Sequence, residues 1–376
     1  MSARRPRLCY VVASAMTVNA FLREHIAAAA GRFDVTVIAN AGSAPDVPAR
    51  FIPVAIDRRI APLADLKALL RLAAIFRRER FDLVHSVTPK AGLLAALAGA
   101  LAGVPLRIHT FTGQVWATRT GAMRVLLRSL DRLTASLATR VLADSASQRE
   151  FLVAEGVVAP GKCRVLGHGS MNGVDAARFR PDPAARAEVR AQAGIPADAV
   201  LFLYLGRFTR DKGLLDLARA FAQIEGAWLL LVGPDEDGIA REIRSLCGPS
   251  ASRLRILGHS GVPERCMAAA DVFVLPSYRE GFGSVILEAA AAEVPAIATR
   301  IYGVTDAIVE GETGFLVPPR DPGALAARML ELQRDAALRP KLGRAARERA
   351  LRDFAPADLV RALLAVYDGM LDEARV

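Results

Sequence analysis

Residues 270–314 read ADVFVLPSYREGFGSVILEAAAAEVPAIATRIYGVTDAIVEGETG. The apolar run Val272–Leu275 predicts a buried strand, which ends at the turn signal Pro276-Ser277. A glycine-rich turn, Gly281 to Gly283, then leads into a predicted helix over Ser284–Glu293. The first amides of a helix have no partner within the helix and lie at the positive end of its dipole. This strand–turn–helix therefore predicts a site for a phosphate group.

Two carboxylates flank this turn, Glu280 before it and Glu288 within the predicted helix. If the intervening residues were all helical, the two would lie about 12 Å apart along the axis, at ~1.5 Å per residue. The acid and base of a glycoside hydrolase are separated by roughly 5–9.5 Å, so these two carboxylates do not share one bond. A longer ligand fits better, with phosphate in its middle and hydroxyls at both ends. A nucleotide-sugar has that shape.

A second strand–turn–helix carries two cations. The apolar run Val200–Leu205 is followed by GRFTRDKG, from Gly206 to Gly213, and a helix is predicted to begin near Gly213. Arg207 and Lys212 therefore follow the end of a strand, where open parallel sheets bind their ligands. Arginine offers a forked donor and lysine a compact charge for phosphate oxygens. This turn predicts a diphosphate site, and the alternative is an ordinary surface loop.

Apolar strand-like runs alternate with helix-like segments along the chain, which predicts an α/β protein with two doubly wound parallel sheets. In the first half the predicted strands are Leu8–Ala13, Val35–Ala39, Phe51–Ile56, Leu83–Val87, Leu106–Phe111 and Val141–Ala143. In the second half they are Val200–Leu205, Trp228–Val232, Leu254–Leu257, Val272–Leu275 and Ala296–Ala298.

The length of 376 residues suits two domains of about 100–200 residues each. The Pro- and Ala-rich stretch Arg180–Asp198 separates the two series of strands and is predicted as the linker. We therefore expect a first domain over 1–180, a second over 181–355 and a final segment, 356–376, with a helix over Ala357–Leu371.

These motifs resemble those of the retaining glycosyltransferases of family 4, which have the GT-B fold. Ser277–Ala289 contains the Glu-x7-Glu pattern, Gly206–Gly213 matches Gly-Arg-x4-Lys-Gly, and Asn172–Phe179 resembles Asn-Gly-Val-Asp-x3-Phe. Within the family, the chain is most similar to capsule and exopolysaccharide-type transferases. The resemblance implies two Rossmann-like domains facing a cleft, with the acceptor on the first domain and the nucleotide-sugar mainly on the second. It also implies that the C-terminal helix returns to the first domain.

The resemblance assigns roles to the motif residues. Arg207 and Lys212 would stabilise the leaving nucleoside diphosphate, while Glu280 would hold the donor-sugar hydroxyls and Glu288 the ribose. The remaining donor-binding candidates are Gly206, Gly281, Phe282 and Gly283. The implied activity moves a hexosyl or N-acetylhexosaminyl group, with retention of configuration, from an NDP-sugar (a UDP-sugar is favoured) to a glycan acceptor. No cofactor or metal is expected, because no Asp-x-Asp pair suggests a metal clamp and the two cations can substitute for one.

His109 is the catalytic candidate of the first half. It lies near the carboxyl end of the strand Leu106–Phe111, where a polar side chain points into the crevice of a parallel sheet. The resemblance implies a position beside the donor sugar, although Thr112 stands where many relatives have a second histidine. The alternative is a histidine with a purely structural role.

Thr17 and Lys90 are acceptor-side candidates. Thr17 follows the first predicted strand, and its alternative role is to cap a helix over Ala20–Ala30. Lys90 lies at a predicted helix start, where a cation is unfavourable for the helix dipole, so an acceptor phosphate is one explanation. The other is a solvated surface lysine.

The net charge of +10 is concentrated in the first half. Residues 1–180 contain 25 Lys or Arg against 12 Asp or Glu, a net charge of +13, and the remainder has 24 against 27, or −3. A basic first half suits an anionic membrane surface or a phosphorylated acceptor. Nucleic acid is not expected as a partner, because no binding motif accompanies the charge. Arg124, Arg128 and Arg132 share one face of a predicted helix and are either membrane contacts or solvated.

The expected location is the cytoplasm, peripheral to the inner face of the cell membrane. Four scattered cysteines indicate reduced thiols, and no signal-peptide pattern is visible. The longest uncharged stretch, Ala91 to Leu106, is too short to span a bilayer. Because the first half is basic, a polyprenyl-diphosphate-linked glycan at the membrane is the favoured acceptor. The alternatives are a transferase with a soluble acceptor, an NDP-sugar 2-epimerase of the same fold, and a non-catalytic binding protein.

Overall fold

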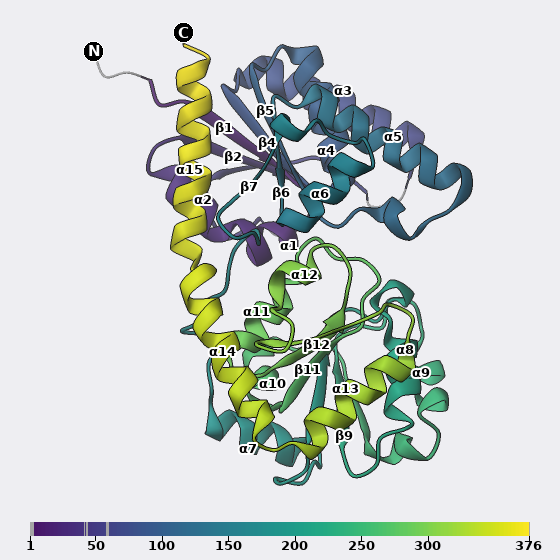
Figure 1. The fold of residues 1–376 in the computed structure, drawn as a ribbon. Coiled ribbons are helices and arrows are strands. Elements are labelled where there is room, and N and C mark those ends of the chain that lie inside the picture. The colour runs from purple at the N-terminus through teal and green to yellow at the C-terminus, as the bar shows by residue number, and fades with distance from the viewer. Residues whose placement is uncertain (1–3, 41, 43, 58–59, 376) are drawn as a thin grey trace. The chain divides into compact units, whose positions relative to one another are not determined.

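The computed structural model describes residues 4–40, 42, 44–57 and 60–375. The chain forms two compact units. The first unit contains Met1–Asn172 and Pro356–Val376, and the second contains Gly173–Ala355. The chain thus passes between the units twice, and the last helix belongs to the first unit (Figure 1).

The first unit is built on a parallel sheet whose described strands follow the order β3-β2-β1-β4-β5-β6-β7. The strands are β1 (Arg7–Val11), β2 (Asp34–Ala39), β3 (Arg50–Pro53), β4 (Leu83–Val87), β5 (Leu106–Phe111), β6 (Arg140–Ala143) and β7 (Cys163–Val165). The helices are α1 (Ala15–Thr17), α2 (Arg23–Ala30), α3 (Pro62–Glu79), α4 (Pro89–Ala102), α5 (Gly121–Leu137), α6 (Ala146–Ala154) and α15 (Pro356–Glu373). A π-helical segment, Val18–Leu22, joins α1 to α2.

Helices cover both faces of this sheet, as expected for strands that are apolar on both sides. Helices α3 and α4 pack on the face that carries Cys9 and Val11, and α5 packs beside α4. Helices α2 and α15 pack on the face that carries Leu8 and Tyr10 (Figure 1). The first unit therefore has a hydrophobic core on each face of its sheet.

A buried chain of hydrogen bonds fastens α15 to the sheet. The hydroxyl of Tyr367 lies 2.5 Å from Nδ1 of His85 and donates to the hydroxyl of Tyr10 at 2.8 Å. The other ring nitrogen of His85 lies 2.7 Å from Oγ1 of Thr110. Burial lowers the pKa of His85 to about 3, so this histidine is neutral. The last helix thus satisfies polar groups that the strands bring into the core.

The second unit contains a parallel sheet with the order β10-β9-β8-β11-β12-β13 among its described strands. The strands are β8 (Leu201–Leu205), β9 (Trp228–Val232), β10 (Leu254–Leu257), β11 (Val272–Leu275), β12 (Ala296–Thr299) and β13 (Gly314–Val317). The helices are α7 (Pro183–Gln192), α8 (Leu214–Phe221), α9 (Ala240–Cys247), α10 (Pro263–Ala269), α11 (Ser284–Ala291), α12 (Val304–Ala307), α13 (Pro322–Arg334) and α14 (Leu338–Asp353). The predicted α/β fold with two doubly wound parallel sheets is confirmed.

The predicted linker, Arg180–Asp198, is wrong, because this stretch contains helix α7 of the second unit. Asp182 caps the helix by accepting from the amide of Ala185, and Pro183 occupies the first turn, where its missing N–H costs nothing. Arg186 and Arg190 then bind the two carboxylate oxygens of Asp271 at 2.7 and 2.6 Å. The helix is therefore an integral part of its unit, which begins at Gly173.

Other differences lie at edges and ends. Strands β7 and β13 were not predicted, because one has only three residues and the other begins with glycine. The alternative role of Thr17 as a helix cap is wrong, since Ser14 is the cap and accepts from the amide of Met16 at 3.2 Å. No helix in the described part of the chain is long and apolar enough to cross a membrane.

Candidate donor site in the second unit

Three turns of the second unit meet backbone against backbone. Gly213, after β8, has a φ of 69°, and a Cβ there would collide with the carbonyl oxygen of Pro276, after β11. Gly303, after β12, has a φ of 84°, and a Cβ there would collide with the carbonyl oxygen of Gly281. Only glycine fits both the dihedral angle and the space at these positions. The turns that follow three neighbouring strands are thus held together by main-chain contact.

The predicted residues Lys212 and Glu280 lie together at this junction. Nζ of Lys212 is 2.6 Å from Oε1 of Glu280, and the two side chains are only 16% and 15% exposed. The sequence interpretation gave them separate ligand groups, the diphosphate and the sugar. The structure instead shows a close ion pair that leaves further donors on the ammonium group. A phosphate oxygen could bind Lys212 while Glu280 keeps it oriented.

Arg207 is held by a different carboxylate. Its guanidinium lies 2.8 Å from Oε2 of Glu236, and both side chains are about half-exposed (44% and 41%). The backbone carbonyl of Arg207 accepts a hydrogen bond from the buried hydroxyl of Tyr204, which fixes the turn while leaving the cation at the surface. An exposed ion pair is worth about 0–1 kcal/mol, so an anionic ligand can replace Glu236 at little cost.

A second ion pair closes the junction and was not predicted. Asp211 binds Arg279 at 2.7 Å, and its backbone carbonyl accepts from the amide of Tyr278 at 2.8 Å. Burial works to raise the pKa of Asp211, but a hydrogen bond from Thr209 and the charge of Arg279 lower it below its usual value. Asp211 therefore stays ionised and ties the turn after β8 to the turn after β11.

Glu288 lies on α11, and its carboxylate forms no ion pair or hydrogen bond with any residue that the structure describes. Burial raises its pKa to about 7, against the opposing charge of Arg178. A carboxyl group kept without a partner in a poorly solvated place is typical of a ligand site. The helix itself begins after Gly283, whose φ is 77°. The amide of Ile286 donates to the carbonyl of Gly283, so the amides of Ser284 and Val285 are the ones that precede the hydrogen bonds of the helix.

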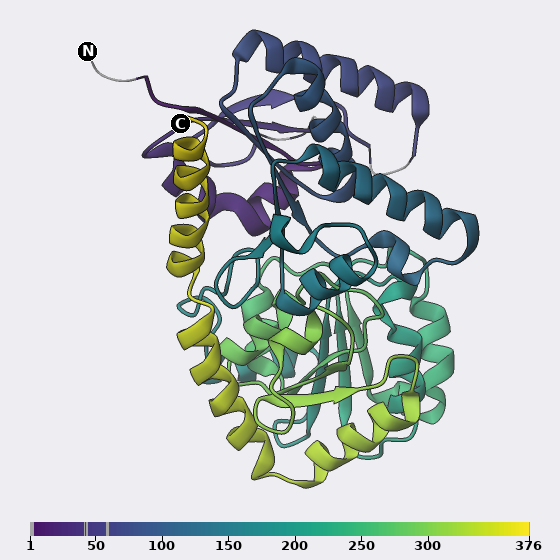
Figure 2. The ribbon, with the colours of Figure 1, turned by 45° about the horizontal axis from the view of Figure 1, so that its top comes forward.

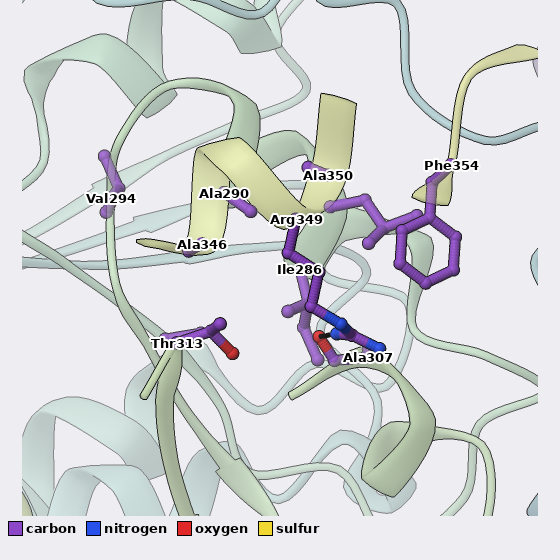
Figure 3. A pocket seen from close by; sticks show the side chains of 11 residues that line it. Ile286, Ala290, Val294, Ala307, Thr313, Ala346, Arg349, Ala350 and Phe354 are labelled. Atoms are coloured by element: carbon purple, nitrogen blue, oxygen red, sulfur yellow. Dashed lines mark hydrogen bonds between the residues drawn. The ribbon is translucent and has the colours of Figure 1, made fainter. Parts of the chain in front are cut away.

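The donor turn rests on the end of α14. The ring of Phe282 packs against that of Phe354 with centroids 5.4 Å apart. Arg349 lies over Phe354, at 5.1 Å from its ring centroid, and donates to the carbonyls of Asp306 and Ala307 at 2.6 and 2.8 Å (Figure 3). Arg349 and Phe354 also line a cavity of about 10 Å³, which is at the lower limit for one water molecule. This cavity is therefore too small for a ligand, and the contacts of Arg349 and Phe354 support α12 and the turn after β11.

Ser277 was taken only as a turn residue. Its side chain is fully buried at the end of β11, and its hydroxyl has no hydrogen-bond partner among the described residues. Its carbonyl accepts from the hydroxyl of Thr299 on β12. A buried hydroxyl without a partner costs free energy, which makes Ser277 a further candidate for contact with a ligand.

In the first unit, the candidate His109 is buried. The ring is 1% exposed and does not point into an open crevice. It lies 3.0 Å from Oγ of Ser86 and packs on α4, where a Cβ on Gly92 would collide with it. Burial lowers its pKa to about 4. The structural role is thus the one that these contacts favour, and a catalytic role stays a prediction.

The acceptor-side candidates differ from each other. Lys90 is not a solvated lysine, because its ammonium lies 2.5 Å from Asp65 on α3 and the side chain is 17% exposed. Thr17 ends the short helix α1, is half-buried, and its hydroxyl has no side-chain hydrogen bond within the described residues. Contact of either residue with an acceptor stays a prediction.

A polar cavity in the first unit was not predicted. It measures about 20 Å³, enough for one water, and lies at the carboxyl ends of β4, β5 and β6. Nδ1 of His25 and Oδ1 of Asp144 are buried there without a partner among the described residues. Burial raises the pKa of Asp144 to about 7.

The three arginines of α5 do not form a uniform basic stripe. Arg124 and Arg128 bind the two carboxylate oxygens of Glu155 at 2.6 and 2.8 Å, whereas Arg132 has no such partner among the described residues. In the described part of the chain, no group of three His, Cys, Asp or Glu side chains is placed to hold a metal ion.

Two α/β units, each built on a parallel sheet, are the architecture of the GT-B fold, which glycosyltransferases share. A family model described as "Glycosyl transferases group 1" matches residues 185–349, and one described as "Glycosyl transferase 4-like domain" matches residues 17–169. The chain belongs to this glycosyltransferase family, as the sequence interpretation predicted.

Three comparisons illustrate the similarity. The chain is 32% identical over 326 residues to the capsular polysaccharide biosynthesis glycosyltransferase CapM of Staphylococcus aureus, with 85% of each chain covered. It is 28% identical to the UDP-Gal:α-D-GlcNAc-diphosphoundecaprenol α-1,3-galactosyltransferase of Escherichia coli, with 82% of each covered. The solved structure of Anabaena HepE in complex with UDP has the same fold, with a TM-score of 0.79, 20% identity and coverage of 96% and 100%.

Proposed function

We propose that the chain transfers a hexosyl or N-acetylhexosaminyl group, with retention of configuration, from a UDP-sugar to a lipid-linked glycan in the synthesis of a surface polysaccharide. The observation that carries the donor part is the Lys212–Glu280 ion pair beside the glycine turn at the start of α11. The relatives named above support the acceptor, since one acts in capsule synthesis and another on an undecaprenol-linked sugar. These names do not favour the epimerase alternative.

In the proposed reaction, the acceptor hydroxyl oxygen bonds to the anomeric carbon of the sugar. The bond from that carbon to the diphosphate breaks, the diphosphate keeps the electron pair, and the hydroxyl proton goes to the leaving diphosphate. Negative charge therefore grows on the diphosphate. Lys212, Arg207 and the first amides of α11 would stabilise this charge more strongly in the transition state than in the bound donor.

The two carboxylates would hold the two ends of the donor. Glu280, oriented by Lys212, would accept hydrogen bonds from the sugar hydroxyls. Glu288 would accept them from the ribose, which would give its carboxylate the partners that it lacks in the described protein. The acceptor would bind the first unit, with Thr17 and Lys90 as candidate contacts.

A thermal-shift panel with UDP, GDP, ADP, CDP and dTDP tests the donor part, with the wild type and Glu288→Ala side by side. A ligand at about 100 times its Kd stabilises the folded state by ~2.7 kcal/mol. We expect a selective shift with UDP that is lost in the variant. A selective shift with another diphosphate would mean that the donor carries that base and not uracil. No shift with any of the five would contradict the donor site.

Two incubations test the reaction. A UDP-sugar alone should remain unchanged, whereas an epimerase would convert it without acceptor. Transfer to an undecaprenyl-diphosphate-linked sugar should proceed in EDTA, because Arg207 and Lys212 would supply the charge that a metal clamp supplies elsewhere. Complete loss with EDTA and rescue by Mg²⁺ or Mn²⁺ would refute the metal-independent mechanism.

A further inference from the structure

Helix α3 leaves a row of leucines uncovered. Leu63, Leu66 and Leu70 are 85%, 53% and 60% exposed. They are spaced three and four residues apart, so they lie on one face of the helix. The opposite face, which includes Leu72 and Phe76, is buried against the sheet and α4. A single exposed leucine needs no explanation, but a contiguous row indicates a contact surface.

Unpaired cations border this row. Lys67 lies one helical turn after Leu63, and Arg71 lies one turn after Lys67. Both side chains are exposed. Neither side chain forms an ion pair or hydrogen bond with another residue that the structure describes. The acidic residues of α3 are already neutralised, because Asp65 pairs with Lys90 and Glu79 pairs with Arg50 and Arg78. The outer face of α3 is therefore apolar in the middle and positive along one side.

Helix α5 extends this surface. Its outer side exposes Met123, Val125 and Leu126, at 46%, 56% and 49%. Helix α4 lies between α3 and α5 and is largely buried, so the two helices present their outer sides on the same side of the unit (Figure 2).

We propose that the leucine face, defined as Leu63, Leu66 and Leu70 with Lys67 and Arg71, lies on an anionic lipid bilayer. The leucines would enter the boundary between headgroups and acyl chains, about 5–10 Å deep, while the two cations reach the lipid phosphates. This inference rests on the proposed lipid-linked acceptor and specifies the surface by which the acceptor-binding unit meets it. A second copy of the chain fits less well, because two such faces would bring like charges together.

Vesicle flotation tests this face without donor or acceptor. The probes are vesicles of phosphatidylcholine alone and vesicles with added phosphatidylglycerol. We expect the wild type to float with the anionic vesicles. The double variant Leu66→Glu/Leu70→Glu should bind them about a hundredfold more weakly, because burial of each leucine is worth roughly a factor of ten. The matched control is Leu351→Glu, on α14 of the second unit, where the leucine is 44% exposed and the effect should be less than about twofold.

A second pair of substitutions isolates the charge. Lys67→Gln/Arg71→Gln should weaken binding to anionic vesicles by about twentyfold, at roughly fivefold per cation, and leave any binding to neutral vesicles unchanged. Equal binding of all variants, or no binding of the wild type, would overturn the proposal. A dimer that the leucine variants dissociate, without vesicle binding, would assign the face to a second copy instead.

The membrane face and the proposed transfer reaction can be tested independently of each other. The leucine variants should keep the wild-type thermal shift with UDP, since α3 belongs to the first unit. They should also retain turnover with an acceptor dispersed in detergent and lose it with acceptor in anionic vesicles. Vesicle binding without any turnover would refute the transferase function and leave the membrane face standing.

Discussion

The two units share one plan but use the ends of their strands differently. In the second unit, β8 and β11 lead into turns that press backbone on backbone and keep Lys212 and Glu280 at a partly open position. In the first unit, β4 and β5 carry His85 and His109, which are buried and bound within the core. The strand ends of the second unit thus present charge, while those of the first complete a core. In the first unit, the exposed leucines and cations described above lie instead on helix α3.

The largest expected effect tests the charge of the second unit. Lys212→Ala should lower kcat by about a thousandfold in protein that remains folded, because the interaction of Lys212 grows as the diphosphate leaves. The measurement is steady-state transfer with saturating donor. Arg210→Ala is the matched control from the same turn, since Arg210 pairs with Glu242, and it should change kcat by less than about threefold. Equal effects of the two variants would show that the position of Lys212 has no special role.

The next effect tests the main-chain contact of the turns. Gly213→Ala should lower the free energy of unfolding by about 3–4 kcal/mol, because it adds both a strained φ and a collision with Pro276. Gly238→Ala is the control, since its φ of 66° is similar but no atom lies within 4 Å of the added Cβ. It should cost about 1 kcal/mol in a urea titration. A similar cost for both would mean that the turns are not tightly packed.

A smaller effect concerns Glu288. Because the pKa of Glu288 is about 7 in the folded state and near its ordinary 4.5 in the unfolded state, the folded state holds the proton more tightly. The stability from this group is present below pH 4.5 and is lost as the pH rises through 7. Glu288→Gln should therefore stabilise the ligand-free protein by about 1–3 kcal/mol at pH 8 and by nearly nothing at pH 4. Urea titrations at both pH values measure this, and a gain that is independent of pH would contradict it.

The same variant should lose the thermal shift with UDP. A substitution that stabilises the protein and removes binding is the expected behaviour of a residue kept for a ligand. Destabilisation at pH 8 would indicate instead that Glu288 supports the fold.

The smallest effect tests the core role of the strand ends in the first unit. Tyr367→Phe removes the hydroxyl that bridges His85 and Tyr10 and should cost about 1–2 kcal/mol. The loss should be constant between about pH 5 and 8, because His85 is neutral throughout, with a pKa of about 3. Hydrogen exchange should report it in β1 and β4 and not in β8 or β11. No change in exchange at β4 would show that the hydroxyl is dispensable.

Most of the fold could be predicted because alternating apolar strands and helices are a local pattern. The turn after β8 could also be predicted, since glycine, arginine and lysine stand at fixed spacings in Gly206–Gly213. The partners of these residues could not be predicted. Lys212 and Glu280 are 68 positions apart, and Arg124 meets Glu155 over 31, so only the folded chain brings them together.

Which polar side chains are buried could not be predicted from the sequence either. His109 lies near the carboxyl end of a parallel strand, which predicts a side chain in the crevice. Its ring instead occupies the space left by the missing side chain of Gly92 on α4. The helix in Arg180–Asp198 was read as a linker because proline and alanine suggested a loop. Its cap, Asp182, is a local signal that this interpretation missed, whereas its contacts to Asp271 join residues more than 80 positions apart. The sequence therefore predicts backbone geometry better than it predicts which polar side chains remain open.

The return of α15 to the first unit affects how a growing chain can fold. A ribosome makes residues 173–355 before it makes Tyr367, so the second unit is complete while the first still lacks its last helix. Until then, Tyr10 and Nδ1 of His85 lack the hydroxyl of Tyr367, and the face that carries Leu8 and Tyr10 is uncovered by α15. The unit synthesised first is thus the last to close, and nascent chains released before Pro356 would present that uncovered face to chaperones and proteases.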